Sequence, residues 1–373
     1  MVWRIASGRL ELILNIVKER NQEMKRYIVF SLIIAALLLF APQSWAGNPQ
    51  RTGCAGASEL LINPFARSSG WADANIGGVT GLESMYMNVA GLSRVNKTEV
   101  VFSNTQWLVG SGISINNFGL GQRVGPGGVL GLSLTSLDYG EWEITTEDQP
   151  EGTGGTISPS SLVIGVAYSQ KFTESIYGGV NIKLYNNNIN NLNTSGVCFD
   201  AGVQYLTGSR KQWKFGVTLR NVGPGLEYAG DGFGVVLPVP TQGVTYSQTF
   251  ESRSAQFELP TQLLLGAAYD FQLGEMNRLT LAGAFVSNSF EKDNYNIGVE
   301  YGFKSYFMLR LGYRIYDNRF DNTVTTAITG FTGGMSFDIP LKKNSDTSFG
   351  VDYSFRATNP FSGIHNIGVR ISL

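Results

Sequence analysis

The chain has 373 residues, of which 28 are basic and 29 acidic, so its formal net charge is −1. This balance lacks the basic surplus of nucleic-acid-binding proteins, and no nucleic-acid partner is expected. A soluble chain of this length would hold about two or three domains, whereas a membrane barrel uses it in one. The 46 glycines, 22 phenylalanines and 16 tyrosines are typical of tilted barrel strands and aromatic girdles.

The chain begins with the features of an export signal. A basic stretch at 24–26 precedes an apolar run over 27–40. A cleavage site of the small-residue type, Ser44-Trp45-Ala46, follows. This order is typical of a secretory signal peptide, and the apolar run is too short for a spanning helix. We expect translation to start at Met24 and the signal peptide to be cleaved after Ala46. Residues 1–23 are then either the result of a mis-assigned start or an unusual leader. Residues 1–46 should then be absent from the mature fold.

The next segment, 47–97, shows neither strand alternation nor the length of a domain. It holds two clusters rich in residue types that favour tight turns. Their members are Asn63, Pro64, Ala66, Arg67, Gly70, Asn88, Ala90, Gly91 and Leu92.

Downstream of this segment, every second residue is compatible with lipid. In 309–312, Leu309 and Leu311 oppose Arg310 and Gly312, which is the period of a strand. Segments of this kind lie near 98–108, 111–120, 128–138, 160–169, 176–186, 195–206, 212–220, 255–270, 278–287, 294–303, 306–316, 327–338, 347–356 and 364–373. The sequence therefore predicts an all-β protein, a transmembrane antiparallel β-barrel of about fourteen strands.

The connections between these strands alternate in length. Those after even-numbered strands are tight, as periplasmic turns should be, while longer ones at 139–159, 187–194, 221–254 and 317–326 would face outside. A soluble sandwich also alternates along each strand but shows no such rhythm in its turns. Because a closed barrel pairs every backbone group without water, the pattern indicates a place in the bacterial outer membrane.

The turn-rich segment gives the chain a resemblance to a known family. It is similar to the N-terminal region of the PorV/PorQ family, relatives of the FadL fatty-acid transporters, although Val89 stands where the family motif usually has proline. The resemblance covers essentially the whole mature chain. It implies a small plug over 47–97 followed by a FadL-like barrel over 98–373.

This resemblance implies a PorV-like component of a type IX protein secretion system. Such a protein binds secreted cargo, through the cargo's C-terminal domain, and translocon or attachment partners. Its work would be binding and not catalysis. The natural contact surface is the outer loops 139–159 and 221–254, since recognition concentrates in loops on a rigid scaffold.

The longest of these loops contains an apolar run. Its members Phe233, Val235, Val236 and Leu237 would be unfavourable in water, which suggests a partner or a ligand. The alternative is a loop folded back over its own barrel.

A second hypothesis is a FadL-like channel that takes up long-chain fatty acids or other hydrophobic small molecules. It requires an apolar pocket against the plug. The candidates are Phe65, Trp71, Met85, Tyr86 and Met87, which either furnish that pocket or pack the plug against the wall. A purely structural barrel is the third hypothesis.

No catalytic, metal or cofactor site is expected. The single histidine, His365, has no second histidine beside it, and no activated nucleophile or acid/base pair stands out. Cys54 and Cys198 are expected to be free. The charges on polar strand faces either line a permeation path or pair with one another in a plugged interior: Lys183, Arg220, Glu300, Arg310, Arg314, Asp352, Arg356 and Arg370.

Overall fold

The computed structural model describes residues 51–373 apart from 52, 242–243, 305, 317–326 and 342–346. The predicted start at Met24 and the predicted cleavage after Ala46 lie outside the described residues, as does the predicted outer loop 317–326.

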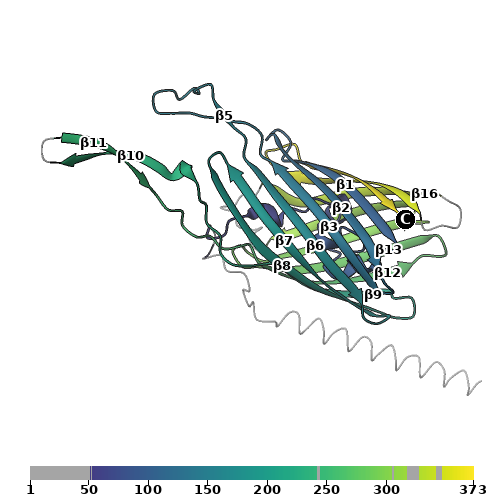
Figure 1. Ribbon diagram of the computed structural model, residues 1–373. Coiled ribbons are helices and arrows are strands. Elements are labelled where there is room, and N and C mark those ends of the chain that lie inside the picture. Colours follow the sequence, from purple (N-terminus) through teal and green to yellow (C-terminus); the bar gives the residue numbers. More distant parts are fainter. Residues whose placement is uncertain (1–50, 52, 242–243, 305, 317–326, 342–346) are drawn as a thin grey trace, which may run out of the picture. The chain divides into compact units, whose positions relative to one another are not determined.

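Within the described residues, fourteen antiparallel strands form a closed barrel (Figure 1). Each strand pairs with its neighbours along the chain, and the first strand pairs with the last to close the ring. The strands are β1 (Thr98–Trp107), β2 (Ile113–Val124), β3 (Gly128–Asp138), β6 (Ser160–Lys171), β7 (Ile176–Ile189), β8 (Leu192–Thr207), β9 (Trp213–Val222), β12 (Gln262–Gln272), β13 (Asn277–Asn288), β14 (Asn294–Phe303), β15 (Phe307–Tyr316), β16 (Ile328–Pro340), β17 (Ser348–Thr358) and β18 (Ile364–Ser372). The predicted barrel is confirmed.

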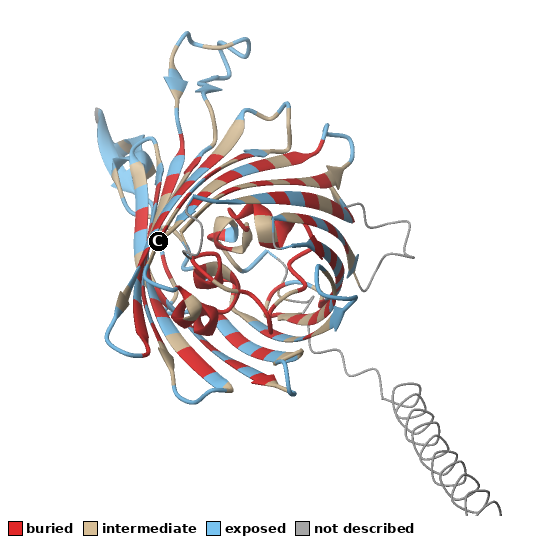
Figure 2. Ribbon diagram, turned by 90° about the vertical axis from the view of Figure 1, so that its right-hand side faces the viewer, coloured by how far each residue is buried: buried red, intermediate tan, exposed pale blue. Residues whose placement is uncertain are grey.

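The alternation of side chains orients every strand. On β7, Val180 and Ile182 point outward and are 54% and 46% exposed, whereas Asn181 and Lys183 point inward and are buried. Figure 2 shows this as stripes of buried and exposed residues around the ring. An outward apolar face and an inward polar face are what a lipid bilayer demands of a barrel.

The strand predicted over 255–270 begins later than expected, at Gln262. Pro260 lies just before it, and a proline cannot donate to a strand ladder. The residues ahead of it form single bridges instead, Leu226 with Phe257 and Ala55 with Glu258.

Two outer connections contain hairpins that stand apart from the barrel sheet (Figure 1). The first pairs β4 (Trp142–Glu143) with β5 (Thr156–Ile157), and the second pairs β10 (Gly234–Thr241) with β11 (Val244–Glu251). The long apolar loop is therefore a two-stranded ribbon in its own right.

Short helices fill the lumen (Figure 2). They are η2 (Ser58–Leu61), α2 (Ala66–Ser69), α3 (Ser84–Met87) and η3 (Val89–Arg94), all from the segment ahead of β1. Most of their residues are buried. They form the plug that the fold prediction placed ahead of the barrel. In the described part of the chain, no helix has the length and apolarity to cross a bilayer.

Candidate functional site

The first turn cluster folds around the buried side chain of Asn63. Its Nδ2 donates to Ser68 Oγ at 3.0 Å and to Asp73 Oδ1 at 2.6 Å, and its Oδ1 accepts from the backbone N–H of Phe65 at 2.9 Å. An asparagine that bonds to nearby backbone in this way sets a tight turn. Asn63 therefore holds the plug chain together just before α2.

The neighbouring carbonyl of Pro64 ties this turn to the barrel. It accepts from Ser103 Oγ on β1 at 2.7 Å and from Asn366 Nδ2 on β18 at 2.8 Å. These are the two strands whose pairing closes the ring. The plug is thus held at the seam of the barrel.

The second cluster depends on Asn88 in a similar way. Its Oδ1 caps η3 by accepting from the N–H of Ala90, and its Nδ2 donates to the carbonyls of Ile76 and Val203 at 3.2 and 3.1 Å. Gly91 follows where the chain passes so close to Val79 that an added Cβ would lie 2.2 Å from its carbonyl oxygen. Only glycine fits there.

The remaining cluster members also seat the plug. Ala66 begins α2, and Gly70 follows that helix where an added Cβ would lie 2.9 Å from the Cα of Gly334 on β16. Leu92 is fully buried in the apolar core of the plug. All the predicted cluster residues therefore lie in the lumen, where they position the plug itself.

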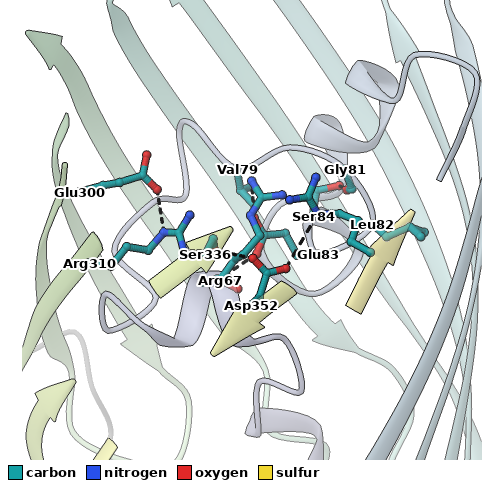
Figure 3. A network of polar contacts seen from close by, with 12 residues as sticks. Arg67, Val79, Gly81, Leu82, Glu83, Ser84, Glu300, Arg310, Ser336 and Asp352 are labelled. Atoms are coloured by element: carbon teal, nitrogen blue, oxygen red, sulfur yellow. Dashed lines mark hydrogen bonds and ion pairs between the residues drawn. The ribbon is translucent and has the colours of Figure 1, made fainter. Parts of the chain in front are cut away.

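Polar side chains of the plug and of one side of the wall lie close together (Figure 3), and the backbone N–H of Leu82 in the plug donates to Glu99 Oε1 on β1 at 3.0 Å. Arg310 donates from Nε to Glu300 and from Nη1 to Ser336 Oγ, both at 2.6 Å, and Ser336 bonds to Asp352. On the plug, Arg67 lies 3.4 Å from Glu83.

The other inward charges also mostly have partners. Lys183 pairs with Asp200 at 2.7 Å, Arg314 pairs with Asp73 at 2.7 Å, and Arg370 pairs with Asp338 at 2.6 Å. Because an unpaired buried charge is strongly destabilising, this arrangement favours a paired, plugged interior over a charged path.

The aromatic and methionine candidates for a hydrophobic pocket mostly pack the plug. Phe65, Trp71, Met85 and Met87 belong to buried apolar clusters between plug and wall. Tyr86 is different, because it also lines a cavity.

That cavity lies between the plug and the strand ends that carry the long connections, and its volume is about 350 Å³. Its wall includes Trp107 from the end of β1, Arg220 from β9, Asn294 from the start of β14 and Arg356 from β17. The strand pattern predicts these arginines only as charges that face the lumen. Nothing in the sequence indicates that they meet in one cavity, since this depends on how the plug is seated.

The apolar run of the longest loop lies on the second hairpin. Phe233 ends η4 (Asp231–Phe233), and β10 carries Val235, Val236 and Leu237, which are 49%, 63% and 47% exposed. Phe233 is half-buried in a short helix that contacts β8, whereas the three β10 residues lie on the hairpin that stands apart from the barrel (Figure 1). The structure therefore separates the two groups of predicted site residues, one inside the lumen and one outside the membrane.

The described residues offer no metal-binding cluster of histidine, cysteine, aspartate and glutamate. His365 lies on β18, where its Nδ1 is 2.9 Å from the Tyr353 hydroxyl. Cys54 is exposed, Cys198 is buried, and both are free thiols.

Comparisons with known proteins give both a family and a fold. The sequence model of the family described as "Type IX secretion system membrane protein PorP/SprF" matches residues 148–358, more than half of the chain. The expected type IX secretion membrane protein is thereby confirmed, although the matching model is PorP/SprF and not PorV/PorQ. No curated protein matches the chain.

Solved FadL-like barrels resemble the structure over most of its length. The CymD monoaromatic hydrocarbon channel has a TM-score of 0.51 at 12% identity, with 83% of this chain and 97% of that chain covered. The toluene transporter TbuX of Ralstonia pickettii has a TM-score of 0.50 at 13% identity, covering 83% and 97%. A FadL homologue of Pseudomonas aeruginosa has a TM-score of 0.50 at 9% identity, covering 82% and 98%. At sequence identities of 9–13%, this similarity shows that the chain shares the fold of these proteins.

Proposed function

Because the chain belongs to the PorP/SprF family of type IX secretion system membrane proteins, we propose that it acts in the outer membrane as a docking protein of that system. Its lumen is filled by a plug held to the wall by hydrogen bonds and ion pairs. Secreted proteins therefore do not pass through this barrel. The protein instead acts by binding its partners at the outer surface of the membrane.

The observation that carries this proposal is the β10–β11 hairpin. It presents aliphatic side chains to water on a ribbon outside the barrel sheet, including Val236 at 63% exposure. Apolar patches on a surface that faces water mark sites where a partner binds. A hairpin that does not fold back on its own barrel leaves that patch available.

Two prolines define how a partner can approach. Pro238 and Pro240 lie on β10 opposite Ser247 and Thr245 of β11. A proline fits a ladder only where its missing N–H would face the open edge. The open edge of β10 therefore lacks two of its N–H donors, which disfavours the addition of a partner strand there and favours binding through the apolar side chains.

In finer detail, we propose a PorV-like role in which the hairpin contacts secreted cargo, through its C-terminal domain, or the translocon and attachment proteins. The family membership and the plugged lumen support such a role. The second outer hairpin, β4–β5, lies on the same loop-bearing side and would widen the contact surface.

The test is replacement of Phe233, Val235, Val236 and Leu237 by serine in the full chain. We expect co-purification of secretion partners to be lost while the barrel still folds, because the changes lie outside the membrane. A matched variant that changes exposed Ser247, Gln248 and Thr249 of β11 to alanine should keep its partners. If the serine variant retains all partners, the docking role of the hairpin is wrong.

A FadL-like uptake channel is the second candidate. The cavity of about 350 Å³ beside the plug favours it, as does the fold shared with proteins described as a hydrocarbon channel and a toluene transporter. In this case the serine variant would keep its protein partners, and it would still bind a long-chain fatty acid in that cavity. Fatty-acid binding and pull-down on the same purified variant separate the two candidates.

A further inference from the structure

Two arginines in the cavity above the plug lack an acidic partner. Arg220 and Arg356 are 3% and 6% exposed, and neither forms an ion pair with a described carboxylate. Each also has a buried Nε–H donor with no acceptor. Buried guanidinium groups in this state are unfavourable unless something supplies the missing negative charge.

The two side chains are nevertheless held in place. Arg220 lies with its guanidinium carbon 3.8 Å from the ring centre of Tyr86 and donates to the carbonyl of Leu60 at 3.2 Å. Arg356 donates to the carbonyl of Asn63 and to Ser69 Oγ, both at 2.8 Å. A guanidinium held in this way needs little further ordering to bind a carboxylate.

Two of the three acidic residues that line the cavity already have partners. Asp73 pairs with Arg314 at 2.7 Å. Glu59 accepts from the Tyr185 hydroxyl and from Asn187. Glu291 is exposed at the rim, so the cavity reaches solvent there.

The same cavity offers unused acceptors and an apolar wall. The side-chain oxygens of Asn294 and Asn296 on β14 are buried without a hydrogen-bond partner. Leu137, Leu264 and Val286 provide apolar surface around them. A fatty acid would meet the arginines but has no N–H group for these oxygens, whereas a peptide has both.

We propose that this cavity binds the C-terminal end of a polypeptide. The terminal carboxylate lies against Arg220 and Arg356, peptide N–H groups donate to Asn294 and Asn296, and an apolar side chain packs on the aliphatic wall. A volume of about 350 Å³ is at the small end of ligand sites, which suits one or two residues. The inference rests on the proposed docking function, because it names one chemical group that a partner brings.

The experiment uses the full chain purified in detergent and the probe acetyl-Ala-Val-Leu with a free carboxylate. Trp107 lines the cavity, so its fluorescence reports binding, and calorimetry measures Kd. We expect the C-terminally amidated peptide to bind at least tenfold more weakly. The double variant Arg220→Gln, Arg356→Gln should lose the preference for the acid over the amide.

The control variant is Arg94→Gln. Arg94 is a half-buried guanidinium that lines a different cavity, so its loss removes the same charge and leaves the peptide site intact. The Kd for the free acid should stay unchanged in this variant. The gel shift between boiled and unboiled protein verifies that each variant still folds as a barrel.

Two results would overturn the inference. Equal affinity for acid and amide would show that the arginines do not bind a terminal carboxylate. Octanoate binding as tightly as the peptide would show that the N–H groups are not used and that the cavity is an amphiphile site. Neither result affects the docking role of the hairpin, which is scored by co-purification of partners with the serine variant.

Discussion

The backbone of Trp71 in the plug lies directly against Gly312 on β15. A Cβ added at Gly312 would come within 2.3 Å of the Trp71 carbonyl carbon. Two backbones this close leave no room for any side chain, and neither is a flexible group that can move aside.

Gly312→Ala should therefore destabilise the folded barrel by about 1–3 kcal/mol or more, as overpacking does. Gly283→Ala on β13 is the matched control, because the nearest atom to its added Cβ is 3.9 Å away. Urea unfolding in liposomes measures both. Equal midpoints for the two variants would mean that the plug is not seated against β15.

The lipid-facing side of the barrel gives a second prediction. Val180→Arg places a charge on the outward face of β7, and near the bilayer midplane this costs about 2–4 kcal/mol. Val236→Arg on the β10–β11 hairpin should cost almost nothing, although Val236 is as exposed as Val180. The difference in unfolding free energy in liposomes tests whether lipid covers one site and water the other.

Removing the plug should open the barrel to ions. A variant without residues 53–96 keeps all fourteen strands of the ring and loses the helices that fill it, so a water-filled lumen remains. Planar-bilayer recordings should show steady conductance for this variant and none for the full chain. A deletion variant that inserts but stays electrically silent would contradict the view that the plug closes the lumen.

Glu174 links two short turns of the barrel. Its carboxylate accepts from Lys171 at 2.6 Å and from Lys211 at 3.2 Å, which lowers its pKa. A lowered carboxylate pKa means that the link is complete at neutral pH and is lost as the pH falls through that value. Carbon-13 NMR of the Glu174 carboxyl should show a midpoint below the ordinary value of about 4.3, and Lys171→Gln with Lys211→Gln should restore it. A normal midpoint in the unchanged protein would show that the link does not form.

Much of the barrel follows from the sequence because lipid imposes a simple rule on each strand. Alternation on β7 and β15 is readable residue by residue, since Val180 or Leu311 must face outward and Asn181 or Arg310 inward. β12 begins later than the sequence pattern predicts, because Pro260 interrupts a stretch whose composition otherwise suits a strand.

The plug follows from no such rule. Its short helices lack a repeating apolar period, and their stability comes from contacts far away in the chain, such as Asn88 with Val203. For the same reason the sequence does not reveal which inward charges have partners. Arg310 and Arg356 look alike on their strands, yet among the described carboxylates only Arg310 meets one.

The position of Pro64 bears on how the protein is assembled. Its carbonyl accepts hydrogen bonds from both β1 and β18, the first and last strands of the barrel. A chain that lacks its final strand can neither close its ring nor complete this contact. A polypeptide without β18 is therefore left with an open sheet edge, whose backbone groups are unpaired, and with a plug that lacks this anchor.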